Sequence, residues 1–249
     1  MERVSNVSRK PRILVLMYKR VLVKLSGEAL AGTKGFGIEP SVVDRLTDEV
    51  RQVHEMGVSL GLVIGGGNIV RGALASQKGM DRVQADYMGM LATIINALAI
   101  QDLLERKGVA TRVMTAIRME KLAEPYIRRK ALRHMEKGRV VIFAGGTGNP
   151  YFSTDTAAAL RAIEMDSEVI IKATKVKGVY TADPHQDPNA TFIPKITFQE
   201  VVKLDLEVMD TAAVSLCKEN KLPIIVLNIE DKGSVCSAIK GDQIGTLVS

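Results

Sequence analysis

The sequence predicts an α/β fold in which helices cover a mainly parallel sheet. Short apolar runs rich in β-branched residues alternate with segments whose apolar residues recur at helical spacing. This alternation is typical of βαβ units, whose crossover helices cover the sheet. Glycine-rich breaks follow three of the strands, at the edge where such sheets bind their ligands. The 249 residues suffice for one large domain or two small ones, and neither a linker nor an internal repeat is evident.

The elements of the first part of the chain follow a basic tail. We expect residues 1–17 to be a flexible extension, with Met17 as the natural start. Strands are predicted at 21–25, 58–64, 111–114 and 140–144, and helices at 41–56, 81–106 and about 121–137. The apolar residues of the long helix 81–106 cover more than one face. Such a helix is either central to the core or half of a subunit interface, and the pattern favours neither.

The second part of the chain continues the alternation. An Ala-rich helix is predicted to reach Met165, followed by a strand at 168–172 and extended chain at 174–180. Asp-Pro pairs then mark a turn-rich loop. A helix at about 210–220, a strand at 224–228, another helix and a strand near 245–248 complete the prediction.

Composition excludes several classes of protein. Aromatic residues make up 4% of the chain, which argues against a base-stacking nucleic-acid module. The net charge of +6 is concentrated partly in the N-terminal tail, so the body suits small anionic ligands better than nucleic acid. Two isolated cysteines indicate a reducing compartment and no metal-thiolate site. No apolar run approaches the roughly 20 residues that span a bilayer, so we expect a cytoplasmic protein that needs no membrane.

Residues 140–159 predict a binding site for an anion. A buried strand, a loop of small residues and a helix N-terminus follow one another, so unpaired backbone N–H groups converge on the loop and the helix dipole favours negative charge. Thr154, Asp155 and Thr156 are expected to cap the helix. A carboxylate in an anion site normally repels the ligand, so Asp155 must cap the helix, position a cation, or do both.

Two further strand ends carry candidate phosphate contacts. Lys24, before Ser26-Gly27, is either an exposed edge-strand lysine or a buried one that meets an anion. Three consecutive glycines, Gly65 to Gly67, let a phosphoryl group approach the backbone, and Arg71 follows. A tight turn with a surface arginine is the alternative. The segment Gly27 to Lys34 resembles a P-loop, but threonine precedes the lysine and no helix is expected after it, so we reject a P-loop NTPase.

The remaining candidates are weak taken alone. Asp86, near the start of the long helix, reads as a solvated first-turn charge. Lys172 ends a strand much as Lys24 does. The three histidines lie in unrelated contexts and none pairs with an obvious nucleophile, so acyl-transfer chemistry has no support.

Taken together, these segments resemble the amino acid kinase fold family, and within it the bacterial uridylate (UMP) kinases. The similarity runs from about Tyr18 to the C-terminus. The blocks that carry it, in fixed order, are Lys24 to Leu30, Gly35 to Ile38, Val63 to Asn68, Asp86 to Thr93, Gly146 to Asp155, Lys172 to Val176, Gly178 to Tyr180, Ala182 to Pro184 and Val208 to Asp210.

The resemblance implies a three-layer α/β/α sandwich and the reaction ATP + UMP ⇌ ADP + UDP with Mg²⁺. It implies one domain, 18–249, with an acceptor-binding part at about 18–165 and an ATP-binding part at about 166–249. Lys24, Arg71, Asp155 and Lys172 would be catalytic, with Asp155 orienting the lysines and no protein metal ligands needed. The implied ATP contacts are Lys24, Leu25, Ser26, Gly27, Gly67, Arg71, Thr174, Tyr180 and Asp183. The implied UMP contacts are Gly66, Asp86 (for the ribose hydroxyls), Thr147, Gly148, Asn149, Pro150, Tyr151, Phe152, Ser153 and Thr154.

The resemblance also implies regulation and assembly. The segment Gly32, Thr33, Lys34, Gly35, Phe36 and Gly37 looks like the family's region near an allosteric GTP site. GTP as activator, UTP as inhibitor and a hexamer built as a trimer of dimers are expected, with helix 81–106 as a dimer interface. Lys177 stands where the family commonly carries an acidic or small polar residue. Carbamate, acetylglutamate, aspartate and isopentenyl phosphate kinases share the ATP half of this fold, and a storage or regulatory protein without turnover is a further alternative.

Overall fold

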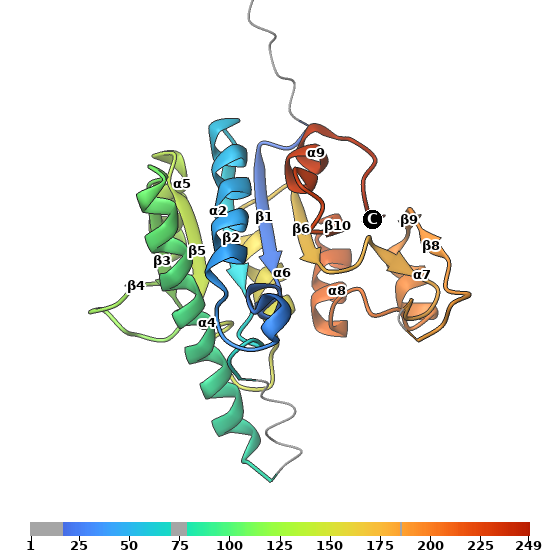
Figure 1. The fold of residues 1–249 in the computed structure, drawn as a ribbon, viewed down its shortest axis with the longest axis horizontal. Coiled ribbons are helices and arrows are strands. Elements are labelled where there is room, and N and C mark those ends of the chain that lie inside the picture. Colours follow the sequence, from blue (N-terminus) through green and yellow to red (C-terminus); the bar gives the residue numbers. More distant parts are fainter. Residues whose placement is uncertain (1–16, 71–78, 185) are drawn as a thin grey trace, which may run out of the picture.

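A mainly parallel sheet forms the centre of the molecule (Figure 1). The computed structural model describes residues 17–70, 79–184 and 186–249. Within these residues nine strands pair in the order β4-β3-β5-β2-β1-β6-β10-β11-β9, and only β10 and β11 are antiparallel. Their bounds are β1 Arg20–Leu25, β2 Ser59–Ile64, β3 Thr111–Thr115, β4 Glu124–Pro125, β5 Val140–Ala144, β6 Val169–Thr174, β9 Lys195–Ile196, β10 Ile224–Asn228 and β11 Thr246–Val248. A separate hairpin pairs β7 Val179–Tyr180 with β8 Phe192–Ile193.

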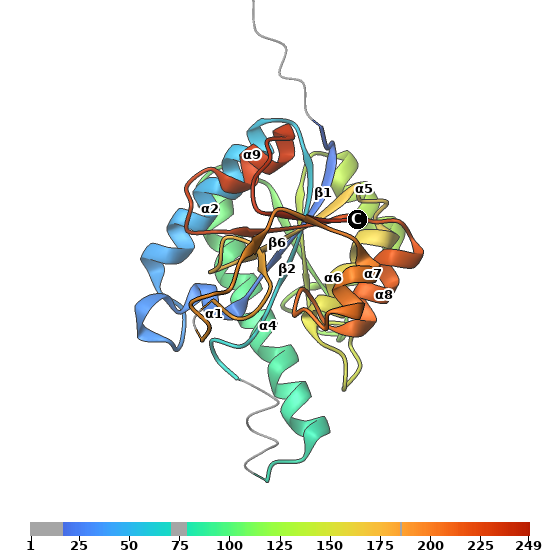
Figure 2. The ribbon, with the colours of Figure 1, turned by 90° about the vertical axis from the view of Figure 1, so that its right-hand side faces the viewer.

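Helices cover both faces of the sheet and make three layers (Figure 2). Helices α2 Pro40–Glu55, α4 Arg82–Arg106 and α9 Ser234–Lys240 pack on one face. Helices α5 Arg128–Glu136, α6 Thr154–Glu164, α7 Phe198–Lys203 and α8 Thr211–Glu219 pack on the other. The short α1 Gly27–Leu30 and a 3₁₀ turn at Gly32–Lys34 follow β1. The expected α/β/α sandwich is therefore present.

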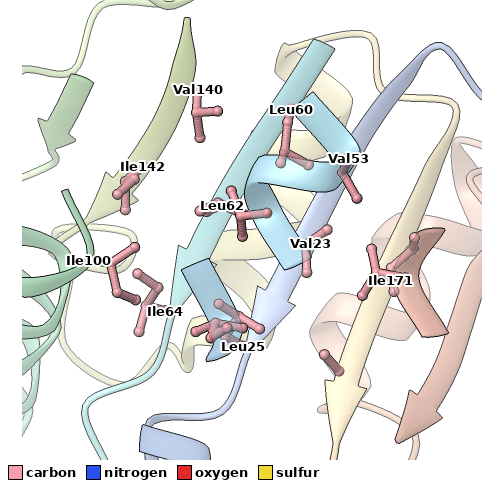
Figure 3. Close-up of a cluster of buried hydrophobic side chains, with 14 of the residues drawn as sticks. Val23, Leu25, Val53, Leu60, Leu62, Ile64, Ile100, Val140, Ile142 and Ile171 are labelled. Atoms are coloured by element: carbon pink, nitrogen blue, oxygen red, sulfur yellow. The ribbon is translucent and has the colours of Figure 1, made fainter. Parts of the chain in front are cut away.

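Two apolar cores result from the two-residue period of the strands. In β1, Val21, Val23 and Leu25 face the first core, whereas Leu22 faces the second. Figure 3 shows the first core, where Leu62 of the neighbouring strand lies among side chains of β1 and α2. Burial of each such side chain contributes about 1.5–3 kcal/mol. The central strands are buried on both faces, which fixes the strand ends that carry the candidate site.

Several predicted boundaries are wrong. The helix predicted at 121–137 begins only at Arg128, because Pro125 disfavours helical backbone before it and the edge strand β4 forms there instead. The extended chain predicted at 174–180 turns after Thr174, whose hydroxyl accepts a hydrogen bond from the Val176 N–H. Helix α1, directly after Ser26, was not predicted. Helix α7 and strands β8 and β9 were missed, although Thr197 and Glu200 form a capping box that signals α7.

Helix α4 is the long helix of the sequence prediction, and it contributes to the core. Ile94, Ala97 and Ile100 face the sheet. Four other apolar side chains of α4, Tyr87, Met88, Leu91 and Ile95, are exposed. In the described part of the chain, α4 is the one helix long and apolar enough by length and composition to cross a bilayer, which the sequence reading had not recognised. Its packing in the first core accounts for much of that apolar character.

Candidate active site

Lys24, Lys172 and Asp155 form a buried ionic cluster at the carboxyl ends of the central strands. Lys24 in β1 and Lys172 in β6 are direct partners in the parallel register. Asp155 approaches from the first turn of α6 and lies 2.5 Å from the Lys24 ammonium and 3.0 Å from that of Lys172. Strand β1 is central and Lys24 is 8% exposed, which excludes an exposed edge-strand lysine.

The cluster shifts the pKa values of Asp155 and Lys172. Burial alone would raise the pKa of Asp155, but the two ammonium groups outweigh it and hold that pKa below its usual value. For Lys172, burial lowers the pKa and the nearby charge of Lys24 lowers it further, against the opposing effect of Asp155. The Lys172 ammonium also donates to the carbonyl oxygen of Val208 at 2.5 Å. The arrangement places one carboxylate between two lysine side chains.

The N-terminus of α6 is fixed by residues other than the predicted caps. Ser153 is the N-cap, and its hydroxyl accepts from the N–H groups of Asp155 and Thr156. Thr154, Asp155 and Thr156 therefore do not cap the helix as expected, and the Asp155 carboxylate contacts Lys24 and Lys172 instead. Asp210, which caps α8, accepts from the hydroxyls of both Ser153 and Thr156. It locks the two helix starts together.

A cavity of about 540 Å³ lies beside this cluster. Among the predicted UMP contacts, its walls contain Gly66, Asp86, Tyr151, Phe152, Ser153 and Thr154. Thr147, Gly148, Asn149 and Pro150 belong to the same loop but do not line the cavity. The sequence reading missed Arg82, Met90, Thr93 and Asp210, which also line it. Arg82 could have been found from its spacing, because it lies four residues before Asp86 on a predicted helix, where such a pair can form a salt bridge.

Asp86 is engaged on both sides rather than freely solvated. Arg82 donates to its two carboxylate oxygens at 3.0 and 2.9 Å, and the Tyr151 N–H donates at 2.8 Å. The Arg82 guanidinium also lies 5.8 Å from the centre of the Tyr151 ring. These contacts join the start of α4 to the loop after β5.

A second cavity, of about 570 Å³, adjoins the cluster at Lys172. Of the predicted ATP contacts, Thr174, Tyr180 and Asp183 line it, together with Lys172 itself. The segment 204–208, which the sequence reading did not include, forms another wall. Lys177 lies outside this lining, with its ammonium 4.9 Å from the centre of the Phe192 ring.

The remaining predicted phosphate contacts gather at the neighbouring strand ends. A Cβ placed on Gly27 would lie 2.6 Å from the Gly65 oxygen and 2.6 Å from the Gly67 nitrogen, so the two loops meet with no room for a side chain. Ser26 precedes this contact, whereas the Leu25 side chain is buried in the first core. Only the backbone of Leu25 is available to a ligand. Arg71 lies outside the described residues.

The segment Gly32 to Gly37 lies beside the triglycine turn. The Gly37 N–H donates to the Asn68 carbonyl oxygen at 2.8 Å. Lys34 pairs with Glu39 at 2.8 Å, and Phe36 is exposed. The expected link of this segment to an allosteric nucleotide stays a prediction.

Comparison with known proteins agrees with this geometry. A model of the amino acid kinase family matches residues 19–228. The chain belongs to this family. A UMP kinase from Bacillus anthracis superposes with a TM-score of 0.90 at 41% identity, over 93% of this chain and 96% of that one. A UMP kinase from Ureaplasma parvum gives 0.87 at 37%, over 93% and 98%. A uridylate kinase from Archaeoglobus fulgidus gives 0.73 at 26%, over 92% and 99%. The expected family, fold and kinase class are confirmed.

Proposed function

We propose that this kinase transfers the γ-phosphoryl group of ATP to UMP, giving ADP and UDP, in the cytoplasmic synthesis of pyrimidine nucleotides. The observation that carries the proposal is the contact between Asp155 and Lys172. Thr154 and Thr156, which flank Asp155, line the first cavity, and Lys172 lines the second. Both cavities have the volume of a ligand pocket. Two nucleotides bound in them would therefore meet at the ionic cluster.

The chemistry assigned to the cluster is electrostatic. Phosphoryl transfer depends on positioning and on cations that neutralise the oxygens of the transferred group. Lys24, Lys172 and Arg71 would supply that charge, and Asp155 would hold the two lysines in place. The acceptor is itself a phosphate with a second pKa of about 6, so it is mostly dianionic at pH 7. It needs no general base, in keeping with the absence of a predicted catalytic histidine.

The first cavity is assigned to UMP. Asp86 would accept hydrogen bonds from the ribose hydroxyls, and the positions of Arg82 and Tyr151 fix its carboxylate. The triglycine turn offers N–H groups for the UMP phosphate, and the helix dipole at the start of α6 favours its negative charge. Residues Thr147 to Pro150 lie outside the cavity lining. An inward movement of their loop would bring them into contact with the uracil base.

The second cavity is assigned to ATP. Thr174, Tyr180 and Asp183 would surround the adenosine, with Lys172 at the inner end. Lys24, Ser26, Gly27, Gly67 and Arg71 would hold the phosphates. The proposed division into an acceptor part, 18–165, and an ATP part, 166–249, is not strict. Asp210 to Ala212 belong to the ATP part but line the acceptor cavity.

Mg²⁺ fits this site as a partner of the nucleotide. In the described ranges no group of three or more Asp, Glu, His or Cys side chains could hold a metal ion, and the lysines occupy Asp155. The ion would therefore be held mainly by ATP phosphates. When bound, it neutralises charge on those phosphates.

The proposal includes assembly and regulation. The exposed apolar residues Tyr87, Met88, Leu91 and Ile95 lie on one side of α4. A second copy that covered them would give the dimer expected from the family resemblance, and three such dimers the hexamer. GTP is proposed as activator and UTP as inhibitor.

A coupled assay of ADP release tests the assignment of the acceptor. We expect turnover with UMP and much slower turnover with CMP, carbamate or acetylglutamate. Equal rates with CMP and UMP, or no turnover with UMP, would refute the proposed substrate.

A further inference from the structure

Two buried asparagines lie behind the triglycine turn and have no role in the chemistry proposed above. Asn68 follows the turn and Asn96 lies in the middle of α4. They are 1% and 0% exposed. Burial of a side-chain amide costs free energy unless its donors and acceptors are paired. The hydrogen-bond partners of these two amides therefore show which backbone segments they connect.

The two amides bind each other and two loop carbonyls. Asn68 Nδ2 donates to Asn96 Oδ1 at 3.0 Å, and Asn96 Nδ2 donates to Asn68 Oδ1 at 2.7 Å. Asn96 Nδ2 also donates to the Gly65 oxygen, and Asn68 Nδ2 to the Gly37 oxygen, both at 2.8 Å. The pair thus joins α4, the triglycine turn and the end of the segment Gly32 to Gly37.

The amide pair also lies directly beneath the loop after β1. A Cβ on Gly27 would lie 2.8 Å from Asn68 Oδ1, in addition to its close approach to Gly65 and Gly67. The Ser26-Gly27 backbone therefore packs on the amide of Asn68 without a gap. Any displacement of that amide must move both loops to which the ATP phosphates are assigned.

The same face of α4 contacts the acceptor side. Thr93, three residues before Asn96, accepts a hydrogen bond from the Gly145 N–H at 2.8 Å. A Cβ on Gly66 would lie 2.7 Å from the carbonyl oxygen of Gly89. One helix face thus holds the backbone on both sides of the proposed phosphoryl transfer.

We propose that Asn68 and Asn96 are positioning residues, whose reciprocal amide pair fixes the triglycine turn and the Ser26-Gly27 loop at the spacing that phosphoryl transfer requires. The inference rests on the proposed function, which assigns phosphates to these loops. Small displacements of positioned groups lower rates steeply while substrate binding changes less.

Kinetics and hydrogen exchange of Asn96→Ala, Asn68→Ala and the double variant test this assignment. In either single variant we expect kcat to fall at least about tenfold and KM for each nucleotide to change less than about threefold. Amide exchange should rise in peptides that cover 26–37 and 65–68. Because the residues share two hydrogen bonds, the double variant should lose less than the product of the single losses.

Thr111→Val is the matched control. Thr111 is fully buried, its hydroxyl donates to the Val109 oxygen, and it begins β3 at the opposite end of the strands. It should lose stability without the loss of kcat or the local rise in exchange. Wild-type exchange at the two loops in both asparagine variants would overturn the inference, whatever the substrate. Absence of turnover with UMP in the wild-type enzyme would instead contradict the proposed function. If one single variant fails to fold, the other decides.

Discussion

Lys24 and Lys172 are direct neighbours across the parallel strands β1 and β6, with the Asp155 carboxylate in contact with both ammonium groups. Two buried cations at adjacent strand positions repel each other. Asp155 offsets that repulsion, and phosphate oxygens of a bound nucleotide would offset the remaining positive charge. A site that is electrostatically incomplete without an anion is suited to phosphoryl transfer.

The lowered pKa of Lys172 predicts the alkaline behaviour of the enzyme. Lys172 loses its proton at a lower pH than the ordinary lysine value of about 10.4, because burial disfavours its charged form. We expect kcat/KM, which reports the ionisation of the free enzyme, to decline on the alkaline side below that value. In the same window the folded protein binds fewer protons than the unfolded chain, so this lysine makes stability rise with pH. A pH profile of kcat/KM, alongside denaturation at each pH, separates the two effects. A constant kcat/KM up to pH 10.4 would argue against a catalytic role for Lys172.

Asp210→Ala should weaken UMP binding and destabilise the fold. Asp210 accepts hydrogen bonds from Ser153, Thr156 and the Ala213 N–H, so its loss removes a helix cap and frees the end of the acceptor loop. Loss of such a cap costs about 1 kcal/mol. We expect KM for UMP to rise while KM for ATP changes little. Asp242→Ala, which removes an exposed carboxylate just after the end of α9, is the control. Equal increases in both KM values would contradict this account.

Ile95→Asp should abolish self-association and leave the monomer folded. Ile95 is 50% exposed on the outer side of α4, so a carboxylate there remains solvated in the monomer and is buried at the proposed interface. Light scattering should show a smaller species, with an unchanged circular dichroism spectrum. Val202→Asp places the same charge on an exposed apolar position of α7 and should keep the wild-type mass. An unchanged mass for Ile95→Asp would place the interface elsewhere.

Glu49→Gln should stabilise the protein at neutral pH. Glu49 is 8% exposed, and burial raises the pKa of its carboxyl group although the Val235 N–H donates to it at 2.8 Å. The ionised carboxylate therefore reduces stability above its folded pKa, and this loss disappears as pH falls toward the unfolded value of about 4.3. Glutamine keeps the acceptor without the charge. Urea unfolding should show a gain at pH 7 that shrinks with acidity, and a loss at pH 7 would refute the reading.

The sequence predicted the strands that carry the site more accurately than the loops around it. Strands at 140–144 and 224–228 match the structure residue for residue, because strands buried inside the sheet are short apolar runs with sharp ends. Helix α5 begins late because Pro125 disfavours helical backbone before it and because β4 pairs there with β3, which is a tertiary contact. Local pattern does not encode such a contact.

The sequence predicted those site residues that lie at the ends of predicted strands and helices, and it missed those that reach the site through the tertiary fold. Lys24, Asp155 and Lys172 each follow or end a predicted element, so topology alone brings them to one edge of the sheet. Asp210 and the segment 204–208 reach the cavities from the far part of the chain. Val208 to Asp210 is one of the blocks that carry the family resemblance, but the sequence analysis assigned no ligand contact to it. Asn96 lies within an apolar helix, where only the fold shows that its amide meets Asn68.

The rate of Asp155→Asn with ATP and UMP tests the central claim most directly, because this change keeps the shape of the side chain and removes the charge between the two lysines. The account predicts a fall in kcat of at least about 10², with UMP affinity measured by calorimetry changed only a few-fold and the fold retained. Lys24→Ala should behave in the same way. A kcat near that of the wild-type enzyme in either variant would contradict the assignment of the Lys24–Asp155–Lys172 cluster to phosphoryl transfer.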